Sequence, residues 1–173
     1  PCTCKEFECS RPEMKDSGYQ DVDVAITTRD LAWLIRDMGI DWNSLEEMDF
    51  DQPLGLYTGA GTIFGVTGGV MEAAIRTGYE LVTGQPIPEV EVTAVRGTEG
   101  FRTSTLKVGD LNLKVGVVTG LKNVIPVLEA VKNGTLDLHF IEVMTCPEGC
   151  VSGGGQPKML MDTDQAEAYA ARR

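Results

Sequence analysis

Hydrophobic and polar positions follow two periods along the chain, one typical of strands and one typical of helices. Residues 21–27 alternate and end in β-branched side chains, which predicts a strand. Residues 29–38 then place apolar side chains at helical spacing, with Thr28 as the expected cap and Gly39 as the stop. We therefore expect a β–α unit that follows a charged loop over residues 1–20.

The remainder of the chain continues this mixture of periods. Gly109 and Asp110 suit a tight hairpin turn between two of the expected strands. The order of elements predicts an α/β fold, with a partly parallel sheet flanked by helices. The expected elements are helices over residues 70–82 and 120–132, and strands over residues 90–95, 102–107, 111–118 and 138–143.

Composition and charge limit the classes of partner that the protein is expected to bind. The chain has 173 residues and a formal net charge of -11. An acidic surface repels phosphate backbones, so nucleic acid is not expected as a partner. No apolar run approaches the ~20 residues that a membrane helix needs, so no membrane association is expected. The acidity favours solubility, although a positively charged redox partner would also fit it.

Five cysteines carry the most information about chemistry. Cys2, Cys4 and Cys9 crowd the first ten residues, whereas Cys146 and Cys150 lie far away. An odd count at uneven spacing is a poor disulfide framework, and intracellular thiols stay reduced, so we expect metal binding in the cytoplasm. Two sulfurs from each end of the chain could hold zinc or an iron–sulfur centre. Cys9 is interpreted instead as a small buried side chain.

The distant cysteine pair directly follows the expected strand 138–143. Pro147 suits the first turn of a helix, which would place Cys146 and Cys150 on one helix face. A helix N-terminus also favours the thiolate form that binds metal. The glycines 153–155 allow a backbone to approach closely. The residues thus predict a thiolate metal centre, with iron–sulfur favoured over zinc.

Three stretches together resemble the FeFe-hydrogenase large-subunit family. Residues 1–8 are similar to its P-C-x-x-K-x-x-E motif, and residues 142–157 to its E-x-M-x-C-x-x-G-C-x-x-G-G-G-x-P motif. Residues 64–74 resemble the family segment between them, and the order and separations agree. The resemblance implies that residues 1–173 are the C-terminal portion of the H-cluster domain, one lobe plus partial elements, in an enzyme that reversibly reduces protons to molecular hydrogen.

The resemblance also implies a cofactor and its ligands. The family binds a 4Fe-4S cluster joined through one cysteine to a diiron unit with carbonyl and cyanide ligands. By motif position, Cys2, Cys146 and Cys150 ligate the 4Fe-4S cluster, and Cys150 also bridges to the diiron unit. Lys5 donates hydrogen bonds to a cyanide, as suits an ammonium beside an anion. The residues implied to line the diiron pocket are Met144, Phe64 and Gly65.

The likeness has departures that bear on partners. The family motif T-S-C-C-P, which supplies the fourth cluster ligand and a proton-relaying cysteine, has no counterpart in this sequence. Glu148 stands where a glycine is usual, and Cys4 where a small residue is common. The implied partners are the remainder of the hydrogenase domain, in the same or a separate chain, and a ferredoxin-like or other redox protein. Glu142 is interpreted as a satisfied structural carboxylate.

Other functions stay open. The glycines at 59, 61 and 65 precede a helix, as in dinucleotide sites, but a turn with close helix packing is favoured because no clear strand precedes them. A non-catalytic iron–sulfur or zinc-binding interaction module would use the cysteines without a diiron unit. A sensory hydrogenase-like protein would bind the same cluster and turn over slowly. The single histidine, His139, is interpreted as structural.

Overall fold

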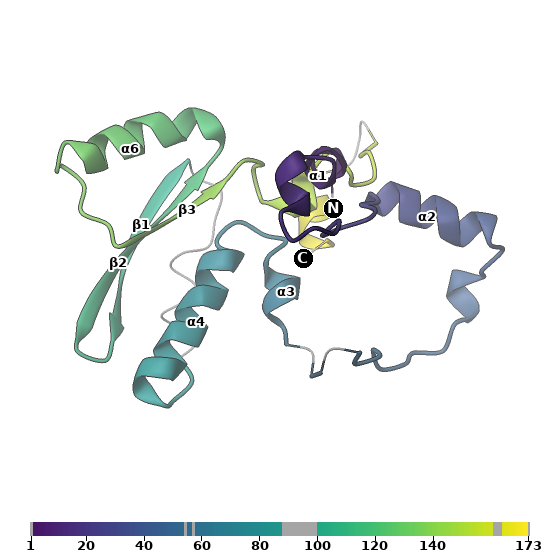
Figure 1. The fold of residues 1–173 in the computed structure, drawn as a ribbon, viewed down its shortest axis with the longest axis horizontal. Coiled ribbons are helices and arrows are strands. Elements are labelled where there is room, and N and C mark those ends of the chain that lie inside the picture. The colour runs from purple at the N-terminus through teal and green to yellow at the C-terminus, as the bar shows by residue number, and fades with distance from the viewer. Residues whose placement is uncertain (1, 54, 57, 88–99, 161–163, 173) are drawn as a thin grey trace. The chain divides into compact units, whose positions relative to one another are not determined.

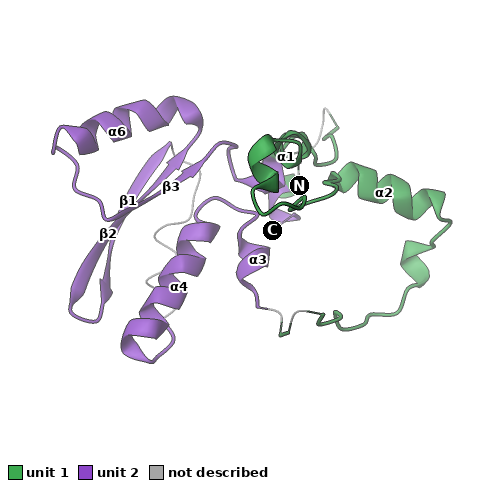
Figure 2. Cartoon of the chain, in the orientation of Figure 1, with its two compact units in different colours: residues 1–57, 153–168 green, residues 58–152, 169–173 purple. Residues whose placement is uncertain are grey.

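Two compact units make up the chain in a computed structural model. The first comprises Pro1–Tyr57 and Gly153–Ala168, and the second Thr58–Ser152 and Tyr169–Arg173 (Figure 2). We call them unit 1 and unit 2. The structure describes residues 2–53, 55–56, 58–87, 100–160 and 164–172. The strand predicted over residues 90–95 lies outside these ranges.

Unit 2 is built on a mixed three-stranded sheet in the order β1-β2-β3 (Figure 1). β1 (Phe101–Val108) and β2 (Leu111–Thr119) form the predicted antiparallel hairpin. β2 and β3 (Phe140–Met144) run parallel, because helix α6 (Val124–Lys132) carries the chain across between them. The predicted α/β fold with a partly parallel sheet is confirmed.

The core of unit 2 lies between this sheet and helix α4 (Gly69–Thr83). β2 contributes Val115 and Val117, which are almost completely buried. Burying each such side chain contributes about 1.5–3 kcal/mol. The remaining members of the core cluster come from α4, the segment after it and β1, and they are Met71, Ile75, Ile87 and Leu106.

The glycine-rich segment before α4 makes a tight turn. A short helix, α3 (Ala60–Ile63), precedes the turn, and Gly68 takes a left-handed φ of 83° at the N-cap of α4. A Cβ on Gly69 would overlap the carbonyl oxygen of Ile63, so only glycine fits there. A Cβ on Gly59 or Gly61 would meet nothing within 4 Å, so the interpretation of the glycines at 59, 61 and 65 as turn and packing residues stays a prediction.

Unit 1 differs from its sequence-based prediction in two places. The expected loop over residues 1–20 contains α1 (Thr3–Cys9) and a 3-10 turn (Pro12–Lys15), so that prediction is wrong. Residues 21–27 form no strand, because the described part of unit 1 offers no second strand for pairing. Unit 1 also contains a 3-10 turn at Trp42–Ser44, and α7 (Gln165–Ala170) begins in unit 1 and ends in unit 2.

Helix α2 (Thr28–Asp37) forms as predicted, but its cap is Thr27 rather than Thr28. The N–H of Asp30 donates to Thr27 Oγ1 at 3.1 Å, and the N–H of Thr27 donates to Asp30 Oδ2 at 2.8 Å. The hydroxyl of Thr27 also donates to Asp30 Oδ2 at 2.6 Å, and this bond, together with the one from the N–H of Thr27, holds the pKa of Asp30 below its usual value. None of the helices in the described ranges combines the length and apolar character needed to cross a bilayer.

Candidate metal centre

The cysteine loop, residues 145–152, starts at the edge of the sheet in unit 2. β3 ends at Met144, which lies opposite Thr119, the last residue of the parallel strand β2. The N–H of Gly120 donates to the carbonyl of Met144 at 2.8 Å. The strand ends therefore fix the point from which the loop leaves the sheet.

The cysteine loop is a series of turns rather than the predicted helix. Glu148 has a left-handed φ of 62° and Gly149 a φ of 87°, which no helix allows. The N–H of Gly149 donates to the carbonyl of Cys146 at 3.1 Å, and a single 3-10 turn follows at Cys150–Ser152. The expectation that the two cysteines share a helix face is therefore wrong.

A second loop, residues 64–68, lies directly against the cysteine loop. The N–H of Thr67 donates to the carbonyl of Glu148 at 3.1 Å, and the N–H of Val151 donates to the carbonyl of Gly65 at 3.1 Å. These hydrogen bonds occupy main-chain groups that a helix at Pro147 would otherwise have used. They bring the expected pocket residues of the 64–68 loop to the segment that carries Cys146 and Cys150.

Replacing Gly149 with alanine is expected to lower the free energy of unfolding by about 2–4 kcal/mol. A Cβ there would lie 2.8 Å from the carbonyl oxygen of Gly65 and from the nitrogen of Thr67, and the φ of 87° adds backbone strain. Gly134→Ala is the matched control, because its φ is also positive at 69° but nothing lies within 4 Å. Urea denaturation of the full-length protein measures both, and equal losses would contradict the close packing.

Glu142 joins the sheet to the start of α4. Its buried carboxylate accepts the N–H of Gly68 at 2.8 Å through Oε1 and the N–H of Met71 at 2.6 Å through Oε2. A negative charge at a helix N-terminus is also favoured by the helix dipole. This geometry confirms the interpretation of Glu142 as a satisfied structural carboxylate, and it anchors the 64–68 loop to β3.

One buried polar atom beside the cysteine loop lacks a hydrogen-bond partner among the described residues. The side chain of Thr67 is buried, and its Oγ1 has no hydrogen-bond partner among the described residues. Buried hydroxyls are normally paired, because an unpaired one destabilises the fold. The sequence alone does not show that this hydroxyl is buried and unpaired, because its pairing depends on packing between distant segments.

Unit 1 holds two of the expected site residues. Cys2 is the N-cap of α1, and Lys5, one turn further on, forms an ion pair with Glu8. The hydrogen bond from Lys5 holds the pKa of Glu8 below its usual value. A pocket of about 430 Å³ adjoins this pair, and its lining residues are Lys5, Glu8, Cys9, Met14, Val22 and Ala25.

The expected cluster ligands and Lys5 are divided between the units. Cys2 and Lys5 belong to unit 1, whereas Cys146 and Cys150 belong to unit 2. Convergence of the three sulfurs therefore stays a prediction. Neither unit, in its described residues, gathers three His, Cys, Asp or Glu side chains around one point. Cys9, expected to be buried, is partly buried.

The described residues of unit 2 fit one side of an iron–sulfur site. Cys146 and Cys150 supply two soft sulfur donors, which such clusters require. Main-chain hydrogen bonds to the 64–68 loop hold the segment between them. The unpartnered hydroxyl of Thr67 lies in that second loop, where a cluster sulfur would provide an acceptor.

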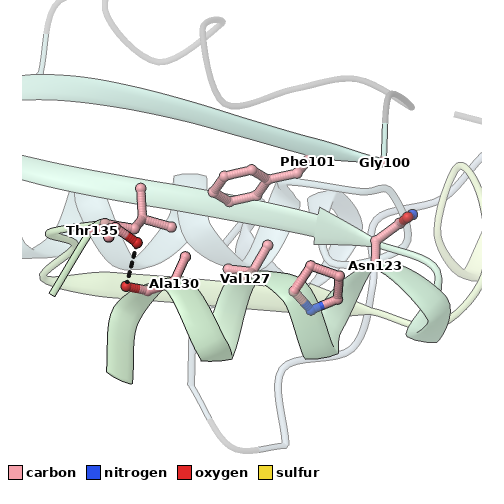
Figure 3. Close-up of a pocket in the computed structure, with 8 residues that line it drawn as sticks. Gly100, Phe101, Asn123, Val127, Ala130 and Thr135 are labelled. Carbon is pink, nitrogen blue, oxygen red and sulfur yellow. Dashed lines mark hydrogen bonds between the residues drawn. The ribbon is translucent and has the colours of Figure 1, made fainter. Parts of the chain in front are cut away.

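Two other features of unit 2 lie away from this site. His139 is exposed, and its Nδ1 accepts the N–H of Lys114 at 2.9 Å, so it is structural as expected. A separate, mainly apolar pocket of about 420 Å³ lies between α6 and the start of β1 (Figure 3). Thr135 closes one end of it by donating to the carbonyl of Ala130 at 3.0 Å. The pocket contains none of the expected ligands.

Comparison with known proteins places these motifs in one family. Residues 1–154 match the family described as "Iron only hydrogenase large subunit, C-terminal domain". The chain is 52% identical over 157 residues to the NADP-reducing hydrogenase subunit HndD of Solidesulfovibrio fructosivorans, covering 91% of the chain and 27% of that protein. It is 47% identical over 175 residues to the periplasmic Fe hydrogenase large subunit of Nitratidesulfovibrio vulgaris, covering 98% and 42%.

More distant similarities extend to a solved structure and to a second kind of protein. A solved variant of the FeFe-hydrogenase HydA1 from Chlamydomonas reinhardtii is 33% identical, with a TM-score of 0.72, covering 99% of the chain and 51% of that structure. The cytosolic iron-sulfur assembly component 3 of Mus musculus is 30% identical over 172 residues, covering 96% and 36%. The chain thus spans 27% to 51% of the length of these four proteins.

Proposed function

The chain belongs to the iron-only hydrogenase large-subunit family, and we propose that it forms part of an FeFe hydrogenase that reversibly reduces protons to molecular hydrogen. The observation that carries this proposal is the contact between the cysteine loop and the 64–68 loop inside unit 2. Two separate family motifs meet there through main-chain hydrogen bonds. The higher identity to hydrogenases than to other relatives supports the same function.

The cofactor in this proposal is a 4Fe-4S cluster joined to a diiron unit with carbonyl and cyanide ligands. Cys2, Cys146 and Cys150 would hold the cluster, and Cys150 would also join it to the diiron unit. When bound, this group supplies the electron storage and the hydrogen chemistry. The chain's own residues would bind it, orient it and keep water away from it.

The walls of the site are formed in this proposal by apolar side chains. Phe64 is 45% exposed at the start of the 64–68 loop, and Met144 is partly buried at the end of β3. Gly65 has no side chain, and its carbonyl accepts the N–H of Val151 from the cysteine loop. Apolar groups at these positions would exclude water and strengthen the electrostatic interactions of nearby charges.

Lys5→Ala is expected to lower diiron content and hydrogen evolution together, while the 4Fe-4S cluster is kept. A charged hydrogen bond contributes roughly 1.5–3 kcal/mol, and the proposed cyanide has no covalent bond to the protein. The same change should let the pKa of Glu8 rise, because the hydrogen bond and charge of Lys5 are the main causes that lower it. Iron content and the infrared bands of carbonyl and cyanide measure the outcome. Lys15→Ala serves as the control, and wild-type diiron content in Lys5→Ala would remove Lys5 from the site.

The proposed partners are the remainder of the hydrogenase domain and a ferredoxin-like or other redox protein. The relatives are longer than this chain, and Leu31 and Leu34 of α2 and its C-cap Met38 are exposed, which together support a covering partner for unit 1. We propose a cytoplasmic location on the basis of the cysteine content. Residues 1–173 alone would supply only three cluster ligands, so poor iron loading is expected of them in isolation.

A second candidate is an iron–sulfur protein without hydrogen turnover. The similarity to cytosolic iron-sulfur assembly component 3, which covers 96% of the chain, favours this alternative. Iron, sulfide and hydrogen evolution measured on the complete protein separate the two. Hydrogen evolution with diiron bands supports the enzyme. A 4Fe-4S cluster without either supports the second candidate, and zinc without iron contradicts both.

A further inference from the structure

We propose that the hydroxyl of Thr67 donates a hydrogen bond to a sulfur atom of the cluster held by Cys146 and Cys150. This bond would raise the reduction potential of the cluster, which makes Thr67 a positioning and tuning residue. The inference rests on the proposed function, because it requires that a cluster is bound. It assigns a role to a side chain outside the expected ligand set.

The backbone of Thr67 is fixed against the middle of the cysteine loop. Its N–H donates at 3.1 Å to the carbonyl of Glu148, which stands midway between the two cysteines. A Cβ on Gly149 would lie only 2.8 Å from the same nitrogen, so the two segments are in close contact. Thr67 therefore cannot move away from the loop without breaking this packing.

The hydroxyl lacks an acceptor that the described protein atoms could provide. The residue is 4% exposed, and its Oγ1 has no partner in the described ranges. Valine has nearly the same shape and would fill the space without burying an unpaired polar group. An acceptor that arrives with a bound group would pair this hydroxyl. Sulfur atoms of an iron–sulfur cluster are such acceptors, and hydrogen bonds to them help set its potential.

The direction of the shift in reduction potential follows from the charge of the cluster. Reduction adds an electron and makes the cluster more negative. A donated hydrogen bond stabilises the more negative form more strongly. Removing the hydroxyl of Thr67 should therefore make the cluster harder to reduce.

A second residue provides a matched control. Thr119, at the end of β2, is also 4% exposed and also has an Oγ1 without a partner among the described residues. Its N–H donates to the carbonyl of Gly100 and its carbonyl accepts from the side chain of Asn123, and both partners lie outside the cysteine loop. Thr119→Val thus removes an equally buried hydroxyl from a different place.

The experiment compares Thr67→Val, Thr67→Ser and Thr119→Val in the complete hydrogenase assembly, loaded with the 4Fe-4S cluster but without the diiron unit. A redox titration followed by electron paramagnetic resonance measures the reduction potential. Thr67→Val is expected to shift the reduction equilibrium by about tenfold toward the oxidised form, which is about 59 mV for a one-electron couple. Thr67→Ser, which keeps the hydroxyl, and Thr119→Val are expected to match the wild type.

Several results would overturn the inference. An unchanged potential in Thr67→Val would do so, and so would equal shifts in Thr67→Val and Thr67→Ser, which would indicate packing. The wild-type protein provides a test that needs no variant. Its reduced cluster should show hyperfine coupling to an exchangeable proton, and absence of this coupling also overturns the inference. Absence of any cluster from the wild-type assembly would overturn the proposed function as well, whereas a normal cluster indifferent to Thr67 overturns this inference alone.

Discussion

Replacing Cys150 with alanine is expected to abolish diiron attachment and hydrogen evolution. Cys150 would be the one residue that bonds to both parts of the cofactor, so no other side chain of this chain can take over the link. The loop around it is held by main-chain hydrogen bonds that do not involve its sulfur, such as that from Val151 to Gly65. The fold of unit 2 should therefore survive the substitution. Iron content, infrared spectra and hydrogen evolution of the complete enzyme measure the loss.

Cys9→Ala is the control for this prediction. Cys9 is partly buried in unit 1, and its carbonyl accepts a hydrogen bond from the side chain of Gln20, which alanine preserves. Diiron content and activity should therefore stay near those of the wild type. Wild-type activity in Cys150→Ala would remove the hydrogenase assignment itself.

Glu142→Ala is expected to lower the free energy of unfolding by roughly 2–5 kcal/mol, because two buried N–H groups lose their acceptor at once. The affected donors are the N–H groups of Gly68 and Met71 at the start of α4. The change should also loosen the 64–68 loop and hence weaken cluster retention. Urea denaturation and iron content of the full-length protein measure the two effects.

Asp30→Ala offers a comparison for Glu142→Ala. Both carboxylates accept main-chain N–H groups near a helix N-terminus. Asp30, however, is exposed, and it belongs to the capping box of α2 in unit 1. Water can replace its interactions, so the loss of stability should be smaller and cluster retention should not change. Equal losses in the free energy of unfolding of the two variants would contradict the expectation that burial of Glu142 increases its contribution to stability.

Elements with strong local patterns could be predicted from the sequence. The hairpin of β1 and β2, the strand β3 and the helices α4 and α6 all formed near the expected positions, because their apolar periodicity agrees with the face that they bury. The strand expected over residues 21–27 had the alternation of a strand but no described partner. The helix α1 was missed because cysteines and charges hide any apolar face in Thr3–Cys9.

The site could be predicted only as a set of residues, not as a geometry. Pro147 suggested a helix, yet the left-handed φ of Glu148 and the bonds to the 64–68 loop produced turns instead. Glu142 was recognised as structural, but its partners 71 and 74 positions away could not be inferred from local pattern. Thr67 was missed altogether, since a buried hydroxyl is visible only when the packing around it is known.

The link between Glu142 and Gly68, 74 positions apart, sets an order for events during synthesis. Chains grow at about 5–20 residues per second, so several seconds pass between the synthesis of the 64–68 loop and that of the cysteine loop. Contacts so distant in sequence also form late in folding, because a long loop must close first. Until then neither segment can present a shaped surface to iron. Under the proposed function, iron would therefore bind only after the cysteine loop has been synthesised and has packed against the 64–68 loop.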